Sequence, residues 1–241
     1  MIEIIPAIDI IDGKCVRLTQ GDFNQKKQYN ENPLEVAKAF EDAGIKRLHL
    51  VDLDGARQKK IINHKVLQAI STNTRLAIDF GGGIQSDEDI QLAFDSGASQ
   101  VTGGSVAVKN PDLFKNWISR FGVGKIILGA DAKNGMIAVA GWQETTEVSV
   151  FDLISQYQES SGIEYIICTD VAKDGLLQGP SFDLYTDILT KFPEVKLIAS
   201  GGVTTKDDLF RLEEMGVYGA IVGKAFYEGN ISLNDLAEFS K

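Results

Sequence analysis

The sequence predicts a closed (β/α)8 barrel, and three observations support this fold class. Short apolar runs alternate with helix-like segments eight times in 241 residues, and such a barrel typically takes about 250 residues. A glycine-rich unit also appears twice: Gly82 and Gly201 are 201 − 82 = 119 positions apart, and so are Gly97 and Gly216. Two four-unit halves close on each other without leaving a sheet edge, which favours the barrel over an open doubly wound sheet.

The predicted strands are short runs that are almost entirely apolar. This is the pattern of parallel strands that are buried on both faces. The strands with the clearest limits are residues 2–8, 47–51, 76–80, 125–130 and 164–169. Three further runs lead into Gly103, Gly201 and Gly223. We expect all eight strands to belong to one domain that spans residues 1–241.

The segments between the strands carry helix signals. Asn32 is a plausible cap before Pro33, and Gly44 ends that helix. The other expected helices cover about residues 64–71, 86–97, 111–117, 149–160 and 182–191, one segment between the seventh and eighth strands, and a last one from Ser232.

Two connections are unusually long for this fold. Residues 10–32 are rich in polar residues and are predicted to form a loop of functional length. The pair Asn134-Gly135 favours a tight turn, so the loop after the fifth strand is expected to contain a small hairpin.

Composition and charge exclude several classes of protein. The net charge of −10 argues against nucleic-acid binding, which depends on clustered Lys and Arg. No apolar run approaches the roughly 20 residues of a membrane span, and the start lacks signal-peptide features, so a cytoplasmic location is expected. Cys15 and Cys168 form no CxxC motif, so a disulfide framework or a zinc site is unsupported.

Four glycine loops follow the third, fourth, seventh and eighth strands in two matched pairs. Their backbone N–H groups can approach a phosphate without a Cβ in the way, and the last two loops are the usual phosphate site of such barrels. One such loop is equally well a tight turn, but two pairs favour a ligand with a phosphate at each end. The residues are Gly82, Gly83, Gly104 and Ser105, then Gly201, Gly202, Gly223 and Lys224.

Two carboxylates occupy matching positions in the two halves. Asp9 follows the first apolar run and Asp131 follows the fifth, so the barrel places them across the mouth from each other. A turn-forming Asp that accepts backbone N–H bonds is the structural alternative. Symmetry and placement favour function, because two opposed carboxylates without a metal cluster suit proton removal and proton donation.

Other polar residues gave weaker indications. His49 lies within a strand and is expected to be structural, since no partner is evident from spacing. Asp52 and Asp54 either line the mouth or cap a turn. Arg17 and Trp142 lie in the two long connections, where they are candidates for ligand contact.

These residues carry a resemblance to a known family. The stretches IPAIDIIDGKCVRLTQGD, HLVDLDGA, GGGIQ, GWQE, CTDVAKDG, SGGV and VGKAFYEG closely resemble the (β/α)8 isomerases of histidine biosynthesis, the ProFAR isomerase family. The resemblance covers essentially the whole chain. It implies an intramolecular oxidoreductase that converts a bis-phosphorylated aminoaldose to an aminoketose by an Amadori rearrangement. It also implies a small-molecule substrate, no cofactor and no metal; we expect a monomer.

The resemblance also implies roles for single residues. Asp9 matches the family's acceptor of the C2′ proton, and Asp131 matches the donor to the ribose ring oxygen. Asp174 matches another mouth carboxylate that could be the acid instead, and Thr169 matches a residue that orients catalytic groups. Arg17 and Trp142 match substrate-contacting positions of the loops.

Alternative functions stay open from the sequence. One is an isomerase that also acts on phosphoribosylanthranilate, and another is the related cyclase subunit of imidazole glycerol phosphate synthase, which would need a glutaminase partner. That cyclase typically has Cys where this chain has Ala7. A non-catalytic phosphate-binding barrel is disfavoured by the intact aspartates. The extra Gly103 leaves open which N–H group of the fourth loop meets a phosphate.

Overall fold

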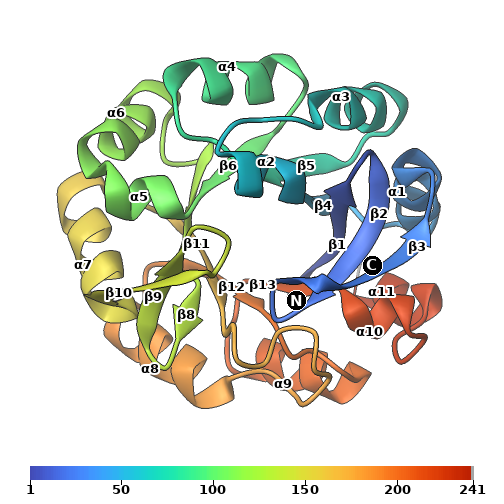
Figure 1. The fold of residues 1–241 in the computed structure, drawn as a ribbon. Coiled ribbons are helices and arrows are strands. Elements are labelled where there is room, and N and C mark those ends of the chain that lie inside the picture. Colours follow the sequence, from blue (N-terminus) through green and yellow to red (C-terminus); the bar gives the residue numbers. More distant parts are fainter. Residues whose placement is uncertain (240–241) are drawn as a thin grey trace.

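The computed structural model describes residues 1–239, in which eight parallel strands close into a barrel inside a ring of helices (Figure 1). The barrel closes because the first strand pairs in parallel with the last, with Glu3 beside Gly219. The fold-class prediction is confirmed. The barrel strands are β1 (Glu3–Ile11), β4 (Arg47–Asp52), β5 (Ala77–Gly81), β6 (Gln100–Gly103), β7 (Ile126–Gly129), β11 (Tyr165–Thr169), β12 (Lys196–Ser200) and β13 (Gly219–Val222).

The main helices follow the strands where the sequence predicted them. Asn32 caps the first helix by accepting a hydrogen bond from the backbone N–H of Leu34. Capping boxes begin with Ser86 and Thr205, which are again 205 − 86 = 119 positions apart. The helices are α1 (Pro33–Asp42), α3 (His64–Asn73), α4 (Asp87–Asp95), α6 (Pro111–Phe121), α7 (Val150–Ser161), α8 (Phe182–Lys191), α9 (Lys206–Glu214) and α11 (Leu233–Glu238).

Three short helices were missed at the sequence level. They are α2 (Leu53–Gln58), α5 (Ser105–Lys109) and α10 (Lys224–Tyr227). Each begins within two residues of the end of a barrel strand and is too short to show a helical repeat of apolar residues. Two of them, α5 and α10, again occupy equivalent positions in the two halves.

The first long connection is not a loop, so that prediction was wrong. β1 continues past Asp9 and turns back as β2 (Lys14–Thr19), which pairs with β3 (Asp22–Asn30). Asp9 therefore lies within a strand rather than after one. The sequence hid β3 because most of its side chains are exposed and polar, which leaves no apolar alternation to detect.

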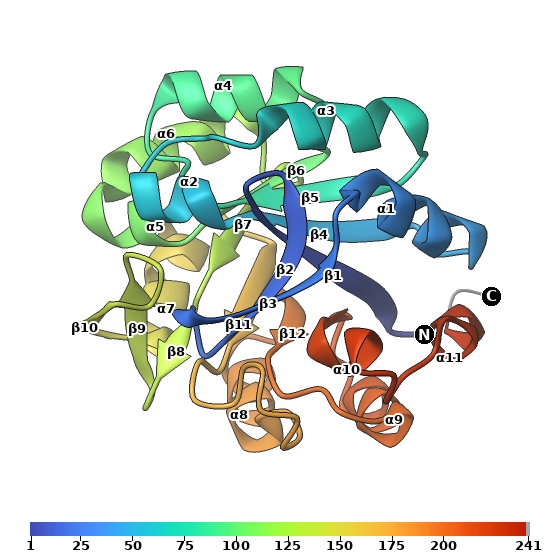
Figure 2. The ribbon, with the colours of Figure 1, turned by 45° about the vertical axis from the view of Figure 1, so that its right-hand side comes forward.

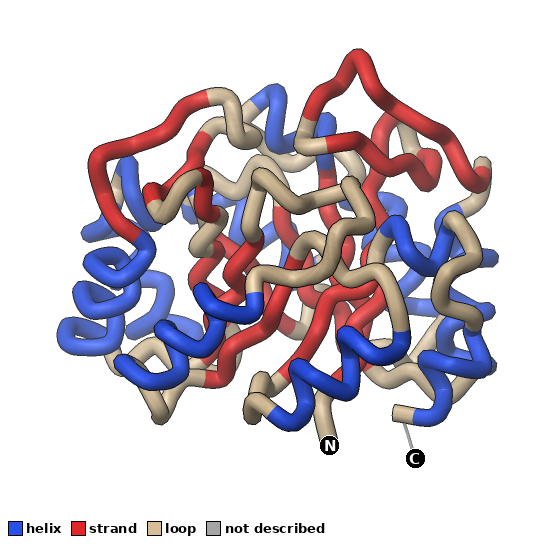
Figure 3. Tube along the Cα trace, turned by 90° about the horizontal axis from the view of Figure 1, so that it is seen from below, coloured by secondary structure: helices blue, strands red, loops and turns tan. Residues whose placement is uncertain are grey.

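The second long connection contains the predicted hairpin. β8 (Ala132–Lys133) pairs with β9 (Met136–Val139) around Asn134 and Gly135, which both have positive φ angles. β10 (Glu144–Ser149) adds a third strand. Figures 2 and 3 show that these strands and the β2–β3 hairpin project from the same end of the barrel, opposite the N-terminus.

The interior of the barrel is a small apolar cluster that is separate from the larger core between strands and helices. It consists of Ile5, Ala7, Ile127, Ile167, Ile198 and Ile221. These residues come from β1 and from the strands of the second half, so the interior is not equally apolar all round. Within residues 1–239, no helix is long and apolar enough to cross a membrane.

Candidate active site

The sequence-predicted site residues line two adjoining cavities at the mouth of the barrel. The larger cavity is lined by Asp9, Arg17, Gly82, Gly83, Gly104, Ser105, Asp131, Trp142, Thr169 and Asp174. The smaller is lined by Gly201, Gly202, Gly223 and Lys224. Arg17 and Asp174 belong to both cavities and therefore mark where they meet.

Asp9 faces a cation. The guanidinium of Arg17, on β2, lies with Nη1 3.0 Å from Oδ2 of Asp9, and its Nη2 lies 3.9 Å from Oδ1 of Asp174. All three side chains are close to nine-tenths buried. The Nε atom of Arg17 is buried without a hydrogen-bond partner in the described chain, and such an orphan donor calls for an acceptor that the protein does not supply.

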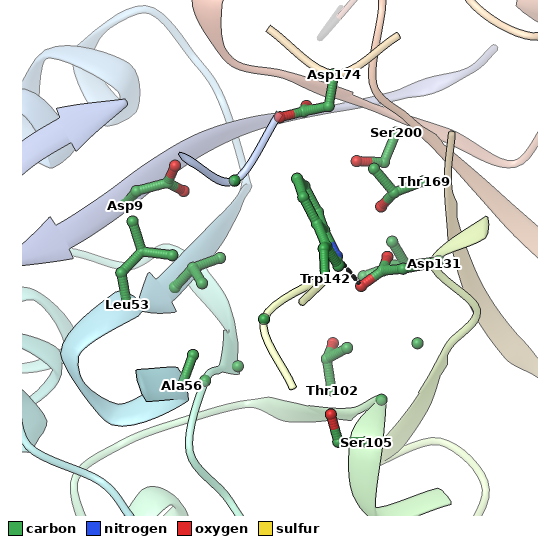
Figure 4. A pocket seen from close by; sticks show the side chains of 18 of the residues that line it. Asp9, Leu53, Ala56, Thr102, Ser105, Asp131, Trp142, Thr169, Asp174 and Ser200 are labelled. Carbon is green, nitrogen blue, oxygen red and sulfur yellow. Dashed lines mark hydrogen bonds between the residues drawn. The ribbon is translucent and has the colours of Figure 1, made fainter. Parts of the chain in front are cut away.

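Asp131 faces neutral donors instead. The indole Nε1–H of Trp142 donates to Oδ2 of Asp131 over 2.8 Å, and the side chain of Thr169 also hydrogen-bonds this carboxylate. Figure 4 shows the Trp142 ring between Asp9 and Asp131, with Thr169 beside Asp131. The two aspartates thus occupy one cavity with partners of different charge.

Burial dominates the electrostatics of all three carboxyl groups. It raises the pKa of Asp9, while the charges of Arg17 and then His49 pull that pKa down. It also raises the pKa of Asp131, against hydrogen bonds from Trp142 and Thr169. Burial raises the pKa of Asp174 to about 6, although the charge of Arg17 opposes the rise. A carboxyl group with a pKa close to neutrality is suited to proton transfer.

The glycine loops have the same backbone conformation in both halves. Gly83 and Gly202 share a φ of +83°, and Gly82 and Gly201 are also in the left-handed region. A Cβ at Gly82 would lie 2.2 Å from the carbonyl oxygen of Asp52, and one at Gly202 would lie 2.3 Å from that of Gly179. Chain packing alone therefore requires these glycines, whatever they bind.

The fourth and eighth loops also correspond. Gly104 and Gly223 precede α5 and α10 with φ angles of −101° and −112°. A Cβ at Gly223 would meet the guanidinium of Arg17 at about 2.5 Å, so glycine lets the arginine reach this loop. A Cβ at Gly103 would strike Phe114 of α6. Gly103 therefore packs against a helix, and Gly104 is the cavity residue.

The two strand-built connections meet over the mouth. The ring of Trp142 lies against Gly21, where a Cβ would come within 2.7 Å of it. The backbone N–H of Ala140 donates to Oγ of Ser105 over 2.9 Å, which ties the second connection to the fourth loop. Lys224 Nζ donates to the carbonyl oxygen of Gly175 over 2.6 Å. These contacts join the segments around the mouth to one another.

His49 is the site residue that sequence reasoning missed. It lines the larger cavity, and its Nδ1 lies 2.5 Å from Oδ2 of Asp79 on the neighbouring strand. These residues are 30 positions apart, so no local spacing revealed the pair. The signal that could have found it was a second polar residue, Asp79, inside an apolar run.

Asp52 and Asp54 serve the fold rather than the cavity. The carboxylate of Asp52 accepts backbone N–H bonds from Gly55 and Ile62 at 2.8 and 2.7 Å. Asp54 accepts from the backbone N–H of Asp12 at 2.7 Å. Neither lines the mouth cavity: Asp52 caps α2, and Asp54 ties the turn after β1 to that helix. Among residues 1–239, no cluster of His, Cys, Asp and Glu could hold a metal ion.

Comparison with known proteins adds independent information. The family model described as "Histidine biosynthesis protein" matches residues 3–232. A relative from Cytophaga hutchinsonii is 64% identical over 240 residues, covering 100% of both chains. One from Flavobacterium johnsoniae is 60% identical over 237 residues, 98% of each chain. Both are named 1-(5-phosphoribosyl)-5-((5-phosphoribosylamino)methylideneamino)imidazole-4-carboxamide isomerase. A Parabacteroides distasonis protein of the same name is 58% identical over 240 residues, again covering 100% of both chains.

Proposed function

The chain belongs to the family of histidine biosynthesis proteins, and from that premise we propose that it is the pathway's ProFAR isomerase. It rearranges the aminoaldose end of a bis-phosphorylated ribotide to an aminoketose. The observation that carries the proposal is the pair of opposed carboxylates, Asp9 and Asp131, in one cavity with partners of different charge.

The rearrangement needs an acid and a base acting in sequence. Asp131 protonates the ring oxygen as the C1′–O bond breaks, and the nitrogen lone pair forms the C1′=N bond. Asp9 then removes the C2′ proton, and the electrons of that C–H bond form an enolamine. Reprotonation at C1′ and loss of the hydroxyl proton at C2′ yield the ketone. C1′ is reduced and C2′ is oxidised within one molecule, so the reaction needs no external redox agent.

The partners of the two aspartates support this division of labour. Arg17 at 3.0 Å favours the ionised form of Asp9, as a base requires. Asp131 has only neutral donors in direct contact, so its protonated form is more accessible. Asp174, with a pKa of about 6, is the alternative acid, and its contact with Arg17 at 3.9 Å is looser. Thr169 is assigned to orienting Asp131.

The two cavities suit the two phosphates of such a substrate. Gly82, Gly83, Gly104 and Ser105 are assigned to one phosphate, and Gly201, Gly202, Gly223 and Lys224 to the other. Arg17, whose Nε lacks a partner in the described chain, offers a charged donor to the second. Trp142 covers the central part of the ligand in this assignment.

Turnover of ProFAR by the purified chain tests the proposal directly. The expected result is conversion to the ribulosyl isomer without added metal, cofactor or partner protein. Parallel assays use phosphoribosylanthranilate, and the cyclase substrate with ammonium. Turnover of ProFAR alone supports the single-substrate isomerase, turnover of both aminoaldoses supports the dual-substrate enzyme, and cyclisation alone overturns the proposal.

A further inference from the structure

Three neighbouring strands bring polar side chains into the barrel interior beside its apolar cluster. β4, β5 and β6 contribute His49, Asp79 and Thr102, and the members of the apolar cluster come from the remaining five strands. His49 and Asp79 lie side by side in the register of β4 and β5. A buried carboxylate is costly unless it is paired and hydrogen-bonded. This group therefore requires an explanation beyond packing.

The three side chains form a chain of hydrogen bonds. The hydroxyl of Thr102 lies 2.5 Å from Oδ1 of Asp79, and Nδ1 of His49 lies 2.5 Å from Oδ2. Asp79 is only 3% exposed. Because an ionised carboxylate can only accept, Nδ1 of His49 carries a proton and donates it. Each oxygen of Asp79 thus holds one donor, and the imidazole ring is fixed.

Because Nδ1 of His49 is bound to Asp79, only its other ring nitrogen, Nε2, is available to the mouth of the barrel. His49 lines the same cavity as Asp9 and Asp131, and Nε2 is on the side of the ring away from Asp79. The cavity therefore has a histidine at its floor whose orientation is set from behind by a buried carboxylate. Such an arrangement determines the tautomer and the charge that the ring presents.

We propose that His49, held by Asp79 and Thr102, is a positioning residue that presents an imidazolium charge to Asp9 and Asp131. This inference rests on the proposed isomerisation. The charge keeps Asp9 ionised before it accepts the C2′ proton, and it stabilises the carboxylate of Asp131 after that residue has given its proton to the ring oxygen. His49 itself transfers no proton in this account.

The charged groups around His49 support a cation at this position. Three carboxyl groups act on it: Asp79 from β5, Asp9 from β1 and Asp131 from the end of β7. Burial lowers the pKa of His49, but Asp79 and then the other two carboxylates more than offset burial and raise it. Arg47, deeper in β4, also interacts with Asp79 and competes with His49 for its charge.

The kinetic test compares pH profiles of kcat/KM for the wild type and His49→Gln. Loss of the cation raises the pKa of Asp9 and of Asp131, so both limbs of the profile should move to higher pH. On the acid side, kcat/KM should fall by about tenfold, which is the effect of a displacement of one pH unit. KM on the plateau should stay unchanged, because His49 does not hold the phosphates.

Two further variants keep the test decisive if His49→Gln fails to fold. Asp79→Asn removes the anion that favours the imidazolium, and Thr102→Val removes only the hydroxyl behind it. Both should move the limbs in the same direction as His49→Gln, with the smaller displacement for Thr102→Val. His64→Gln, which changes the chain's other histidine, should leave the profile in place. Unmoved limbs in folded His49→Gln and Asp79→Asn proteins would overturn the proposal.

Nuclear magnetic resonance separates this inference from the proposed function. The chain has two histidines, so imidazole ¹⁵N spectra contain two sets of signals, and His64→Gln assigns them. His49 should be doubly protonated at pH 7 in the wild type and neutral in Asp79→Asn. A neutral His49 in the wild type contradicts the inference even if ProFAR is turned over. Absence of turnover with a protonated His49 instead contradicts the isomerase assignment.

Discussion

The two halves of the barrel place a carboxylate at the same position and give it different neighbours. In the first half Asp9 contacts the guanidinium of Arg17 at 3.0 Å. In the second half Asp131 accepts the indole N–H of Trp142 at 2.8 Å. The duplicated unit supplies the geometry of an opposed pair, whereas the unrelated connections supply the partners. The two carboxylates thus have equivalent positions in the barrel, and the inserted strands give them partners of different charge.

The glycine loops that we assign to the phosphates show the same relation. Their backbones agree closely, with a φ of +83° at both Gly83 and Gly202. Their side chains differ, because the fourth loop ends in neutral Ser105 and the eighth in cationic Lys224. The second half therefore carries the stronger electrostatic attraction for an anion, even though the backbones of the two halves correspond.

The largest expected effect comes from the carboxylate of the first half. Asp9→Asn keeps the shape of the side chain and removes the base, so kcat should fall by roughly 10³- to 10⁴-fold, with KM changed by less than about threefold. Steady-state kinetics on ProFAR measure both constants. Asp12→Asn is the matched control, since Asp12 is exposed and outside the cavity. Near-wild-type kcat for Asp9→Asn excludes it as the base.

The carboxylate of the second half should matter somewhat less. Asp131→Asn removes the acid but leaves neutral donors and solvent to assist departure of the ring oxygen, so we expect a loss of roughly 10²- to 10³-fold in kcat. Asp174→Asn should cost about tenfold, because it alters only the environment of Arg17. The reverse order of the two losses transfers the acid role to Asp174.

Asp174 should also change how the free energy of unfolding depends on pH. Its pKa is about 6 in the fold and near 3.9 in an unfolded chain, so the folded protein binds this proton more tightly. Its contribution is complete below about pH 4 and is lost as the pH rises through 6. Asp174→Asn cannot ionise, and its advantage over the wild type should grow by up to about 3 kcal/mol between pH 4 and pH 7.5. Urea unfolding at both pH values measures this growth, and a constant difference contradicts burial as the cause.

The phosphate loops should give the smallest effects. Lys224→Met removes a charged donor and should raise KM by about tenfold with little change in kcat. Ser105→Ala removes a neutral one and should raise KM by about threefold. Lys206→Met is the matched control, because Lys206 pairs with Glu238 on the surface, away from both cavities. Equal increases in KM for Lys224→Met and Ser105→Ala would contradict the expected difference between the two loops.

Much of the fold was predictable because buried parallel strands leave a continuous apolar signal. The apolar runs located the ends of the barrel strands to within a few residues. They also predicted that Asp9 and Asp131 lie opposite each other. β3 was hidden because its side chains are exposed, so no alternation marked it. The partners of the carboxylates were equally hidden, since contacts such as His49 with Asp79 join residues far apart in the chain. Arg17 and Trp142 were candidates from their place in the long connections and matched substrate-contacting positions by resemblance, but neither observation said which carboxylate each one contacts.

The central claim is that Asp9 acts ionised and Asp131 acts protonated. The most direct measurement is the pH dependence of kcat/KM for ProFAR in the wild type, Asp9→Asn, Asp131→Asn and Asp174→Asn. We expect a bell-shaped profile that loses its rising limb in Asp9→Asn and its falling limb in Asp131→Asn, and keeps both in Asp174→Asn. A falling limb that survives in Asp131→Asn and disappears in Asp174→Asn would assign the acid to Asp174 instead.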